Sequence, residues 1–196
     1  MARLALVTGG CRRLGAHIAV RLAWAGYDVA LHAGHDPTCE PWLAGRLAQV
    51  RSHVFVADLA DPVAVDALPG DVASWFGQPV ELLVNNASRF AAIKAGQGGA
   101  FAEVVDHAAV NLAAPVALAL KVAELAGDRG AAIVNVLDQR IAHPPRDQLG
   151  YTLSKQALAE ATRTLAPSLA PRVRVNGVAP GLVLPTEGYS AAQVER

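Results

Sequence analysis

The sequence predicts a doubly wound α/β domain built on a parallel sheet. Short apolar runs alternate with longer amphipathic stretches, which is the pattern of repeated strand–helix–strand units. The run Ala131–Leu137 is hydrophobic, as expected for a strand that is covered on both faces. The chain has 196 residues with no internal repeat or low-complexity segment, so one domain over residues 1–196 is expected.

Strands are expected at the apolar runs Leu4–Val7, Val29–Leu31, Val54–Ala57, Leu82–Val84, Ala131–Leu137 and Val173–Val178. Helices are expected at Leu14–Ala25, Pro41–Val50, a stretch that starts near Asp61-Pro62, Phe101–Leu125 and Tyr151–Leu165. Gly26 would end the first helix, and Pro115 would bend the fourth. Asp61 suits an N-cap and Pro62 the first helical position. The glycine-rich segment 95–99 is expected to be a surface loop.

Charge and cysteine content limit the class of protein. Seventeen basic residues balance seventeen acidic ones, so no global attraction to nucleic acid or an anionic membrane is expected. The N-terminal apolar run is too short for a signal segment or a membrane span. Cys11 and Cys39 have no metal or redox spacing and are expected to be free thiols in a reducing compartment. A cytoplasmic protein with a small-molecule partner is the expectation.

A glycine-containing turn lies between the first strand and the first helix. The segment Thr8–Gly15 contains Gly9 and Gly15, with Arg13 where a middle glycine could stand. Glycine lets the backbone approach a phosphate, and the N-terminus of the following helix offers free N–H groups, beginning at Leu14. Arg13 would add positive charge to a phosphate site. A solvated arginine pair in a tight packing turn is the alternative.

The end of the second strand carries histidines rather than the acid that often binds ribose hydroxyls. His32 and His35 favour a site that tolerates a 2′-phosphate, and hence NADP(H). Asp36 would oppose that phosphate if it pointed inward. The histidines could also be surface residues, and without a third ligand they predict no metal site.

Polar residues also follow the third and fourth strands. Asp58-Leu59 could accept a hydrogen bond from an adenine amino group, although Asp58 could equally cap the next helix. Asn85, Ala87 and Ser88 end the fourth strand, where small polar residues line the crevice of an open α/β sheet. Turn chemistry is the alternative for each of them. Their occurrence at successive strand ends favours a binding site.

Tyr151 and Lys155 stand four residues apart and would share one face of a helix. A lysine beside a tyrosine favours the phenolate and improves the phenol as a proton donor or acceptor. Asp138 lies upstream, at the end of the fifth strand.

These residues together resemble the short-chain dehydrogenase/reductase family. The resemblance rests on Thr8-Gly9…Gly15, Asn85-Asn86-Ala87, Asn111, Tyr151-x-x-x-Lys155 and Pro180-Gly181. It implies a Rossmann fold with strand order 3-2-1-4-5-6 and a nicotinamide dinucleotide. It further implies that Tyr151 exchanges the proton, that Lys155 binds the nicotinamide ribose and lowers the phenol pKa, and that Asn111 holds a relay water.

Two departures resemble one branch of the family, the pteridine reductases and the related dihydromonapterin/dihydrofolate reductases. Asp138 stands where most members place a serine, and Arg13 gives the first loop its T-G-x-x-x-R-x-G form. Ser88-Arg89-Phe90 and Pro180-Gly181-Leu182 match the same branch. The resemblance implies NADPH as cofactor, an Asp138–Tyr151–Lys155 set, and a substrate ring sandwiched by Phe90.

Electrostatics favours the same branch. An ionised carboxylate beside a ketone would repel the alkoxide that forms as hydride arrives. Reduction of a ring C=N needs a proton on nitrogen instead, which an Asp–Tyr pair can deliver. Phe90 offers a flat apolar face, and Ser88, Asp138 and Tyr151 complete the expected substrate contacts. The alternatives are Asp138 as a cap, Phe90 as a core residue, a short-chain carbonyl reductase acting on 3-oxoacyl groups or small ketones, and a non-catalytic dinucleotide-binding regulator.

The C-terminal region departs from the family pattern. After Pro185 the sequence offers only a short polar helix candidate, whereas family members continue with a further helix and a last strand. We therefore expect the sequence to be incomplete at its end. Val183 and Leu184 are expected to line the substrate pocket. The family also suggests a homo-oligomer, a dimer or a tetramer, through the apolar faces of Phe101–Leu125 and Tyr151–Leu165.

Overall fold

The computed structural model describes residues 2–90, 99–145 and 148–184. Six parallel strands form one sheet in the order β3-β2-β1-β4-β5-β6. The strands are β1 Arg3–Val7, β2 Tyr27–Ala33, β3 Ser52–Val56, β4 Leu82–Asn85, β5 Ala131–Val136 and β6 Val173–Val178. β1 pairs with both β2 and β4, so the winding reverses at β1 and opens a crevice at the carboxyl ends of these strands. The predicted Rossmann-type sheet is confirmed.

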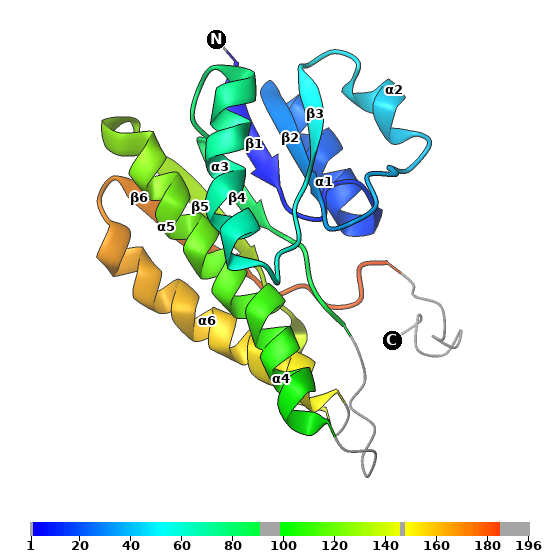
Figure 1. Ribbon diagram of the computed structural model, residues 1–196, viewed down its shortest axis with the longest axis vertical. Coiled ribbons are helices and arrows are strands. Elements are labelled where there is room, and N and C mark those ends of the chain that lie inside the picture. The colour runs from blue at the N-terminus through cyan, green and yellow to red at the C-terminus, as the bar shows by residue number, and fades with distance from the viewer. Residues whose placement is uncertain (1, 91–98, 146–147, 185–196) are drawn as a thin grey trace.

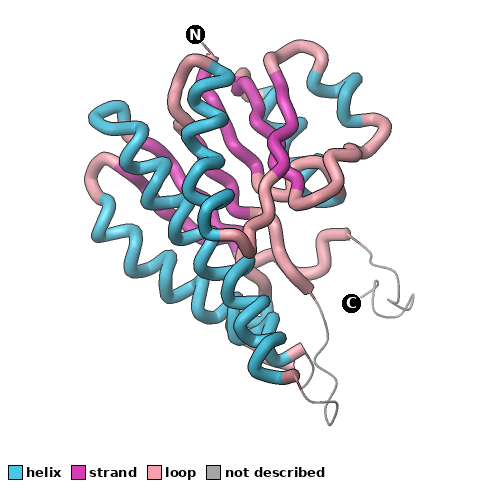
Figure 2. Tube along the Cα trace, viewed as in Figure 1, coloured by secondary structure: helices cyan, strands magenta, loops and turns pink. Residues whose placement is uncertain are grey.

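Helices cover both faces of the sheet (Figures 1 and 2). They are α1 Arg13–Trp24, α2 Leu43–Leu47, α3 Pro62–Phe76, α4 Ala100–Ala108, α5 Ala114–Ala126 and α6 Leu149–Leu169. Short turns complete the list: η1 Ala109–Ala113, η2 Gly127–Arg129 and η3 Gln139–Ile141. α3, α5 and α6 pack on one face, while α1 and α2 pack together on the other.

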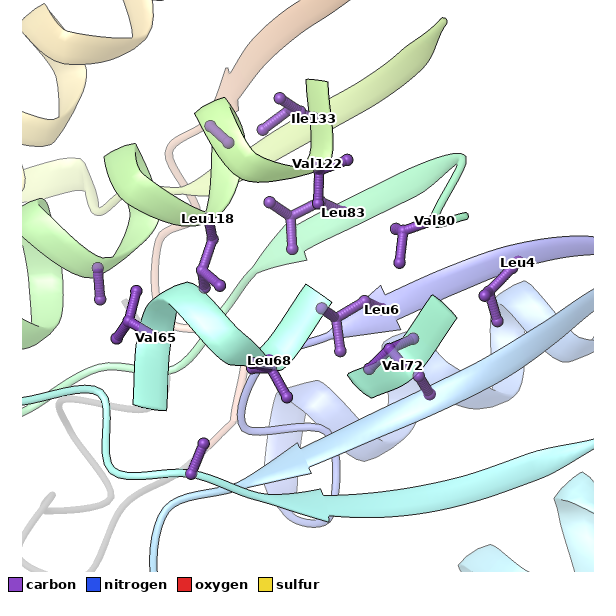
Figure 3. Packing of buried hydrophobic residues seen from close by; sticks show 14 of the residues in the cluster. Leu4, Leu6, Val65, Leu68, Val72, Val80, Leu83, Leu118, Val122 and Ile133 are labelled. Carbon is purple, nitrogen blue, oxygen red and sulfur yellow. The ribbon is translucent and has the colours of Figure 1, made fainter. Parts of the chain in front are cut away.

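Two apolar clusters fill the layers between the sheet and the helices. On the first face, Leu118 and Val122 of α5 lie over Leu83 and Ile133 of the central strands, as Figure 3 shows. On the second face, α1 presents alanines and Val20 to β1 and β2. The central strands are therefore apolar on both sides, which explains why they could be predicted from their apolar runs.

The start of α3 follows its predicted cap chemistry. The Asp61 side chain accepts a hydrogen bond of 2.9 Å from the Val63 N–H, and Pro62 occupies the first helical position.

Other boundaries differ from the sequence prediction. β2 is longer than Val29–Leu31, and α2 is shorter than Pro41–Val50. The expected helix Phe101–Leu125 is two helices joined by one π-helical turn, Ala109–Ala113, rather than one helix bent at Pro115. Pro115, which has no N–H to donate to a helical carbonyl, lies in the first turn of α5, directly after this π turn. Asn111 lies within this π turn and is its buried residue.

The stretch Ala100–Arg129 is long and apolar enough to cross a membrane by length and composition, with a hydropathy of 1.5. Core helices of globular proteins meet the same criterion, and here α5 packs against α3 while α4 packs against α6. Most of the expected 95–99 loop, and the polar helix expected after Pro185, lie outside the described residues.

Candidate functional site

A pocket of about 940 Å³ lies at the carboxyl end of the sheet. The segment after β6 crosses this end of the sheet (Figure 1), and the Gln139 N–H donates to the Pro180 oxygen at 3.1 Å, which joins it to the segment after β5. The predicted site residues in the pocket wall are Gly9, Arg13, Leu14, Gly15, Ala87, Ser88, Phe90, Asp138, Tyr151, Lys155, Pro180, Gly181, Leu182, Val183 and Leu184.

The glycine turn is packed too closely for side chains. Gly9 has a φ of 62°, and a Cβ on Gly15 would lie 2.0 Å from the Gly9 oxygen. The Asn86 side chain donates to the Thr8 oxygen at 2.9 Å and so fixes the turn to the end of β4. The result is a backbone cradle at the N-terminus of α1, which is suited to an anion.

Two arginines flank this cradle. Arg13 begins α1 with a φ of 50°, a left-handed conformation that is uncommon for a residue with a side chain. Arg12 also lines the pocket, and its Nε donates to the Thr38 oxygen at 3.0 Å while its guanidinium forms an ion pair with Asp36. Hydrogen bonds from Thr38 and then from Arg12 lower the pKa of Asp36 to about 2, so this side chain remains an anion.

The two histidines have different surroundings. His32 is buried, its Nδ1 accepts from the Gly9 N–H at 3.2 Å, and its Nε2 lies 2.8 Å from the Ala57 oxygen. Burial lowers the pKa of His32. Both ring nitrogens are engaged by the backbone, so His32 braces the glycine turn and is not placed to meet a phosphate. His35 is exposed, 3.8 Å from the Asp58 carboxylate, and remains a candidate.

Three predicted residues near the ends of β3 and β4, Asp58, Leu59 and Asn85, lie outside the pocket wall. Asp58 accepts from the Ala60 N–H at 2.9 Å and is exposed, whereas Leu59 belongs to the apolar core. Asn85 is buried and donates to the Asn135 side chain at 2.8 Å, which ties β4 to β5. The side chains of Leu59 and Asn85 therefore support the fold beneath the site.

Asn111 is completely buried and holds the segment that leads to Phe90. Its oxygen accepts from the Arg89 N–H at 2.7 Å and from the Ser88 hydroxyl at 3.1 Å. Its amide nitrogen donates to the Arg89 oxygen at 2.9 Å and to the Ser154 hydroxyl at 3.0 Å. An amide side chain has two donors and two acceptor positions, so this set uses them fully. The Asn111 side chain thus holds the Ser88–Arg89 segment in place. The relay water implied by the family resemblance stays a prediction.

Tyr151 and Asp138 meet inside the pocket. The Tyr151 hydroxyl donates to Asp138 Oδ2 at 2.8 Å, and Asp138 Oδ1 accepts from the Arg140 N–H at 2.9 Å. The carboxylate therefore caps a short turn and holds the phenol at the same time. The Phe90 ring packs edge-on to the Tyr151 ring at 4.7 Å and is 55% exposed, so Phe90 is a pocket residue and not part of the core.

The ionisation of the pair differs from the expected phenolate. Burial, followed by the hydrogen bond and the negative charge of Asp138, raises the pKa of Tyr151, and these causes outweigh the lowering by Arg140 and Ser88. Lys155 is buried on the same helix, donates to the Val136 oxygen at 2.7 Å, and lies 5.8 Å from the Tyr151 ring. Burial lowers the pKa of Lys155 to about 8. The phenol is thus protonated at neutral pH.

Sequence reasoning missed Arg140. Its guanidinium carbon lies 5.7 Å from the Phe90 ring centre and 5.8 Å from that of Tyr151, and its Nε is 3.9 Å from Asp138 Oδ1. The only signal in the sequence is its position two residues after Asp138. Its approach to Phe90 depends on how two distant loops meet.

A family model described as short chain dehydrogenase matches residues 3–194. The chain belongs to this family of oxidoreductases. Among relatives, pteridine reductase 1 of Leishmania tarentolae is 35% identical over 95% of this chain and 78% of its own length. The 3-oxoacyl-[acyl-carrier-protein] reductase FabG of Staphylococcus aureus is 32% identical over 94% of this chain and 76% of its own length.

Among solved structures, FolM alternative dihydrofolate reductase 1 of Brucella canis, crystallised with NADP, has a TM-score of 0.89. It is 38% identical, and the match covers 98% of this chain and 77% of that protein. The resemblance to pteridine reductases and related dihydrofolate reductases is therefore confirmed at the level of similarity.

Proposed function

We propose that the chain is an NADPH-dependent reductase that transfers a hydride to a C=N bond of a pterin-type substrate, such as a dihydropterin or dihydrofolate. The observation that carries this proposal is the 2.8 Å hydrogen bond from the Tyr151 hydroxyl to Asp138, beside the exposed Phe90 ring. Similarity to FolM and to pteridine reductase 1 supports the same substrate class.

The residues present fit a nicotinamide dinucleotide. The cradle that a Cβ on Gly15 would fill suits a pyrophosphate, and Arg12 and Arg13 suit further phosphate charge. Lys155 would hold the nicotinamide ribose, and Ala87 and the segment Pro180–Leu182 would line the cofactor. When bound, NADPH supplies the hydride. The relatives crystallised with NADP support the choice of the phosphorylated dinucleotide.

Tyr151 would donate the proton to the substrate nitrogen. Its raised pKa keeps the phenol protonated at neutral pH, which suits reduction better than oxidation. Asp138 aims the hydroxyl, and its carboxylate can also accept a hydrogen bond from the heterocycle. Phe90 would pack on the flat ring. Asn111 would keep the Ser88–Phe90 segment at the distance that this packing needs.

Reduction of a carbonyl is the second candidate, favoured by the similarity to FabG. Its weakness is electrostatic, because the Asp138 carboxylate would lie beside a developing alkoxide. A non-catalytic dinucleotide-binding regulator is the third candidate. The hydrogen bond from Tyr151 to Asp138 and the nearby Lys155 disfavour this third candidate, since dinucleotide binding alone needs no such proton donor. For each candidate we place the protein in the cytoplasm, in keeping with its free thiols.

The test is a panel of substrates, with turnover of each measured as the oxidation of NADPH. We expect turnover with dihydrobiopterin, dihydromonapterin or dihydrofolate, and loss of that turnover in Tyr151→Phe. Turnover of ketones and acetoacetyl thioesters alone would support the second candidate. Full activity in Tyr151→Phe would refute catalysis at this site. A binding titration should also give tighter binding of NADPH than of NADH, and equal affinities would contradict the cofactor assignment.

A further inference from the structure

The segment after β2 contacts the two arginines that flank the phosphate cradle. Here we call residues 36–40 the strap. Within it, Asp36 forms an ion pair with Arg12, the Thr38 oxygen accepts from Arg12 Nε at 3.0 Å, and Glu40 Oε1 accepts from the Arg13 N–H at 3.3 Å. The strap therefore places two carboxylates on the arginine and the helix N-terminus that would otherwise meet phosphate.

The two cysteines of the chain lie where the strap contacts the glycine turn. Cys39 belongs to the strap and Cys11 to the turn, and the adjacent Glu40 N–H donates to the Cys11 oxygen at 2.9 Å. The Cys39 side chain contributes to the raised pKa of the Cys11 thiol, which places the two side chains beside each other, and the Cys39 thiol donates to the Pro37 oxygen at 3.5 Å. Both side chains pack in the same apolar cluster as Val7 and Leu31. Residues 28 positions apart in the sequence are thus brought together as a dithiol.

We infer that Cys11 and Cys39 form an oxidisable dithiol, and that their disulfide locks the strap against the arginines of the phosphate cradle and weakens dinucleotide binding. The reagent class is a two-electron oxidant, either a hydroperoxide or the disulfide of a small thiol. The inference rests on the dinucleotide part of the proposed function and needs no pterin.

The chemistry with hydrogen peroxide runs in two steps. Cys39 is the partly exposed thiol, so its sulfur attacks the peroxide O–O bond, giving a sulfenic acid and releasing one water. The Cys11 sulfur then attacks the Cys39 sulfur, the S–S bond forms, the S–O bond breaks, and the leaving hydroxide takes the Cys11 proton to become a second water. Two thiols are oxidised and one peroxide is reduced. Burial and the contact with Cys39 raise the pKa of Cys11 to about 12, which assigns the first attack to Cys39.

Locking the strap disfavours binding for two physical reasons. A phosphate that binds Arg12 must displace Asp36 from it. The disulfide would keep the segment that carries Asp36 close to Arg12. The disulfide would also draw Cys11 toward Cys39. The glycine turn is tightly packed, since a Cβ on Gly10 would already lie 2.8 Å from the Val7 oxygen. A shift of Cys11 therefore moves the backbone that would cradle the pyrophosphate.

The experiment uses the full chain, intact mass and NADPH fluorescence titration, before and after treatment with hydrogen peroxide or oxidised glutathione. We expect the oxidised monomer to lose two hydrogen atoms in mass and its Kd for NADPH to rise about tenfold, with dithiothreitol restoring both. Cys39→Ser, which leaves the phosphate-facing residues intact, should bind NADPH normally and resist the oxidant. Cys39→Ala repeats the control without a hydroxyl.

Three results would overturn the inference: only sulfinic or glutathione adducts in place of the two-hydrogen loss, a disulfide that leaves the Kd unchanged, or an equal response in Cys39→Ser. Failure of the proposed function has a different signature. If the reduced chain binds NADPH but reduces no pterin, the substrate assignment fails and the dithiol stands. If the reduced chain binds no NADPH, the cofactor assignment and the locking effect fail together.

Discussion

At Tyr151, one carboxylate and two cations act on a single phenol. Asp138 hydrogen-bonds to it at 2.8 Å and raises its pKa, whereas Arg140 acts in the opposite direction. Lys155 is anchored to the strand oxygen of Val136. In the proposed reaction the phenol would be the acid that gives its proton to the substrate, and the two cations would offset the charge that remains.

Arg140 should matter through Asp138. We predict that Arg140→Gln lowers kcat for the reduction about tenfold, because the anionic Asp138–Tyr151 pair loses its nearby cation, while Arg140→Lys keeps most of the activity. The effect should shrink in an Asp138→Asn background, which a double-mutant cycle measures. Arg129→Gln, on an exposed turn, is the matched control. Additive effects of Arg140→Gln and Asp138→Asn on kcat would contradict a role of Arg140 through Asp138.

The buried ammonium of Lys155 should lower the free energy of unfolding of the protein without bound cofactor. Its pKa is lowered to about 8 from 10.5, so between these pH values the unfolded chain binds more protons and stability rises with pH. We predict that Lys155→Met is inactive yet more stable than the native chain by up to about 3 kcal/mol at about pH 7, with the gap narrowing toward about pH 9.5.

Urea denaturation at the two pH values measures this gap, and Lys121→Met, at a partly exposed lysine paired with Glu124, is the control. A Lys155→Met variant that is less stable than the native chain at about pH 7 would show that the buried ammonium is stabilising.

At the scale of elements, the π turn between α4 and α5 places Asn111 under the Ser88–Phe90 segment. We predict that Asn111→Ala destabilises the fold by about 1–3 kcal/mol, because the Arg89 N–H and C=O lose their buried partner. Activity should fall while NADPH binding is largely kept. Urea denaturation and a titration check this, with the exposed Asn176→Ala as control. Unchanged stability would contradict the positioning role.

The sequence predicted the elements whose signals are local. The central strands are buried apolar runs, Asp61-Pro62 carries its own cap chemistry, and Tyr151 and Lys155 share a helix face by spacing alone. The π turn was not predicted, because a single i→i+5 turn leaves the apolar periodicity of the flanking helices nearly unchanged. His32 was misplaced, because its burial depends on β2 being an interior strand whose end is covered by the glycine turn. The contact of Arg140 with Phe90 and those of the strap with Arg12 are non-local, so the sequence alone could not place them.

At the scale of the whole molecule, an apolar surface lies along α4 and the start of α6. Phe101, Val105, Leu149 and Leu153 are 44–84% exposed on these two helices, which pack together. Exposed apolar side chains on two adjacent helices favour a partner. We predict a homo-oligomer, a dimer or a tetramer, held through this surface.

Light scattering at micromolar concentration measures the assembly. Phe101→Lys combined with Leu153→Lys should give a monomer, whereas Trp24→Lys, at an exposed aromatic of α1, should leave the assembly intact. A native chain that is monomeric under these conditions would contradict the prediction.

In the proposed function, Asp138 makes a short-chain reductase site prefer a substrate with a ring C=N over one with a carbonyl. The most direct measurement is the ratio of kcat/KM for dihydrobiopterin to that for an acetoacetyl thioester, in the native chain and in Asp138→Ser, with NADPH affinity measured alongside. We predict that the substitution lowers kcat/KM for the pterin at least about a hundredfold, leaves the thioester rate equal or higher, and keeps NADPH binding. Equal loss on both substrates, or a pterin rate that survives the substitution, would contradict the claim.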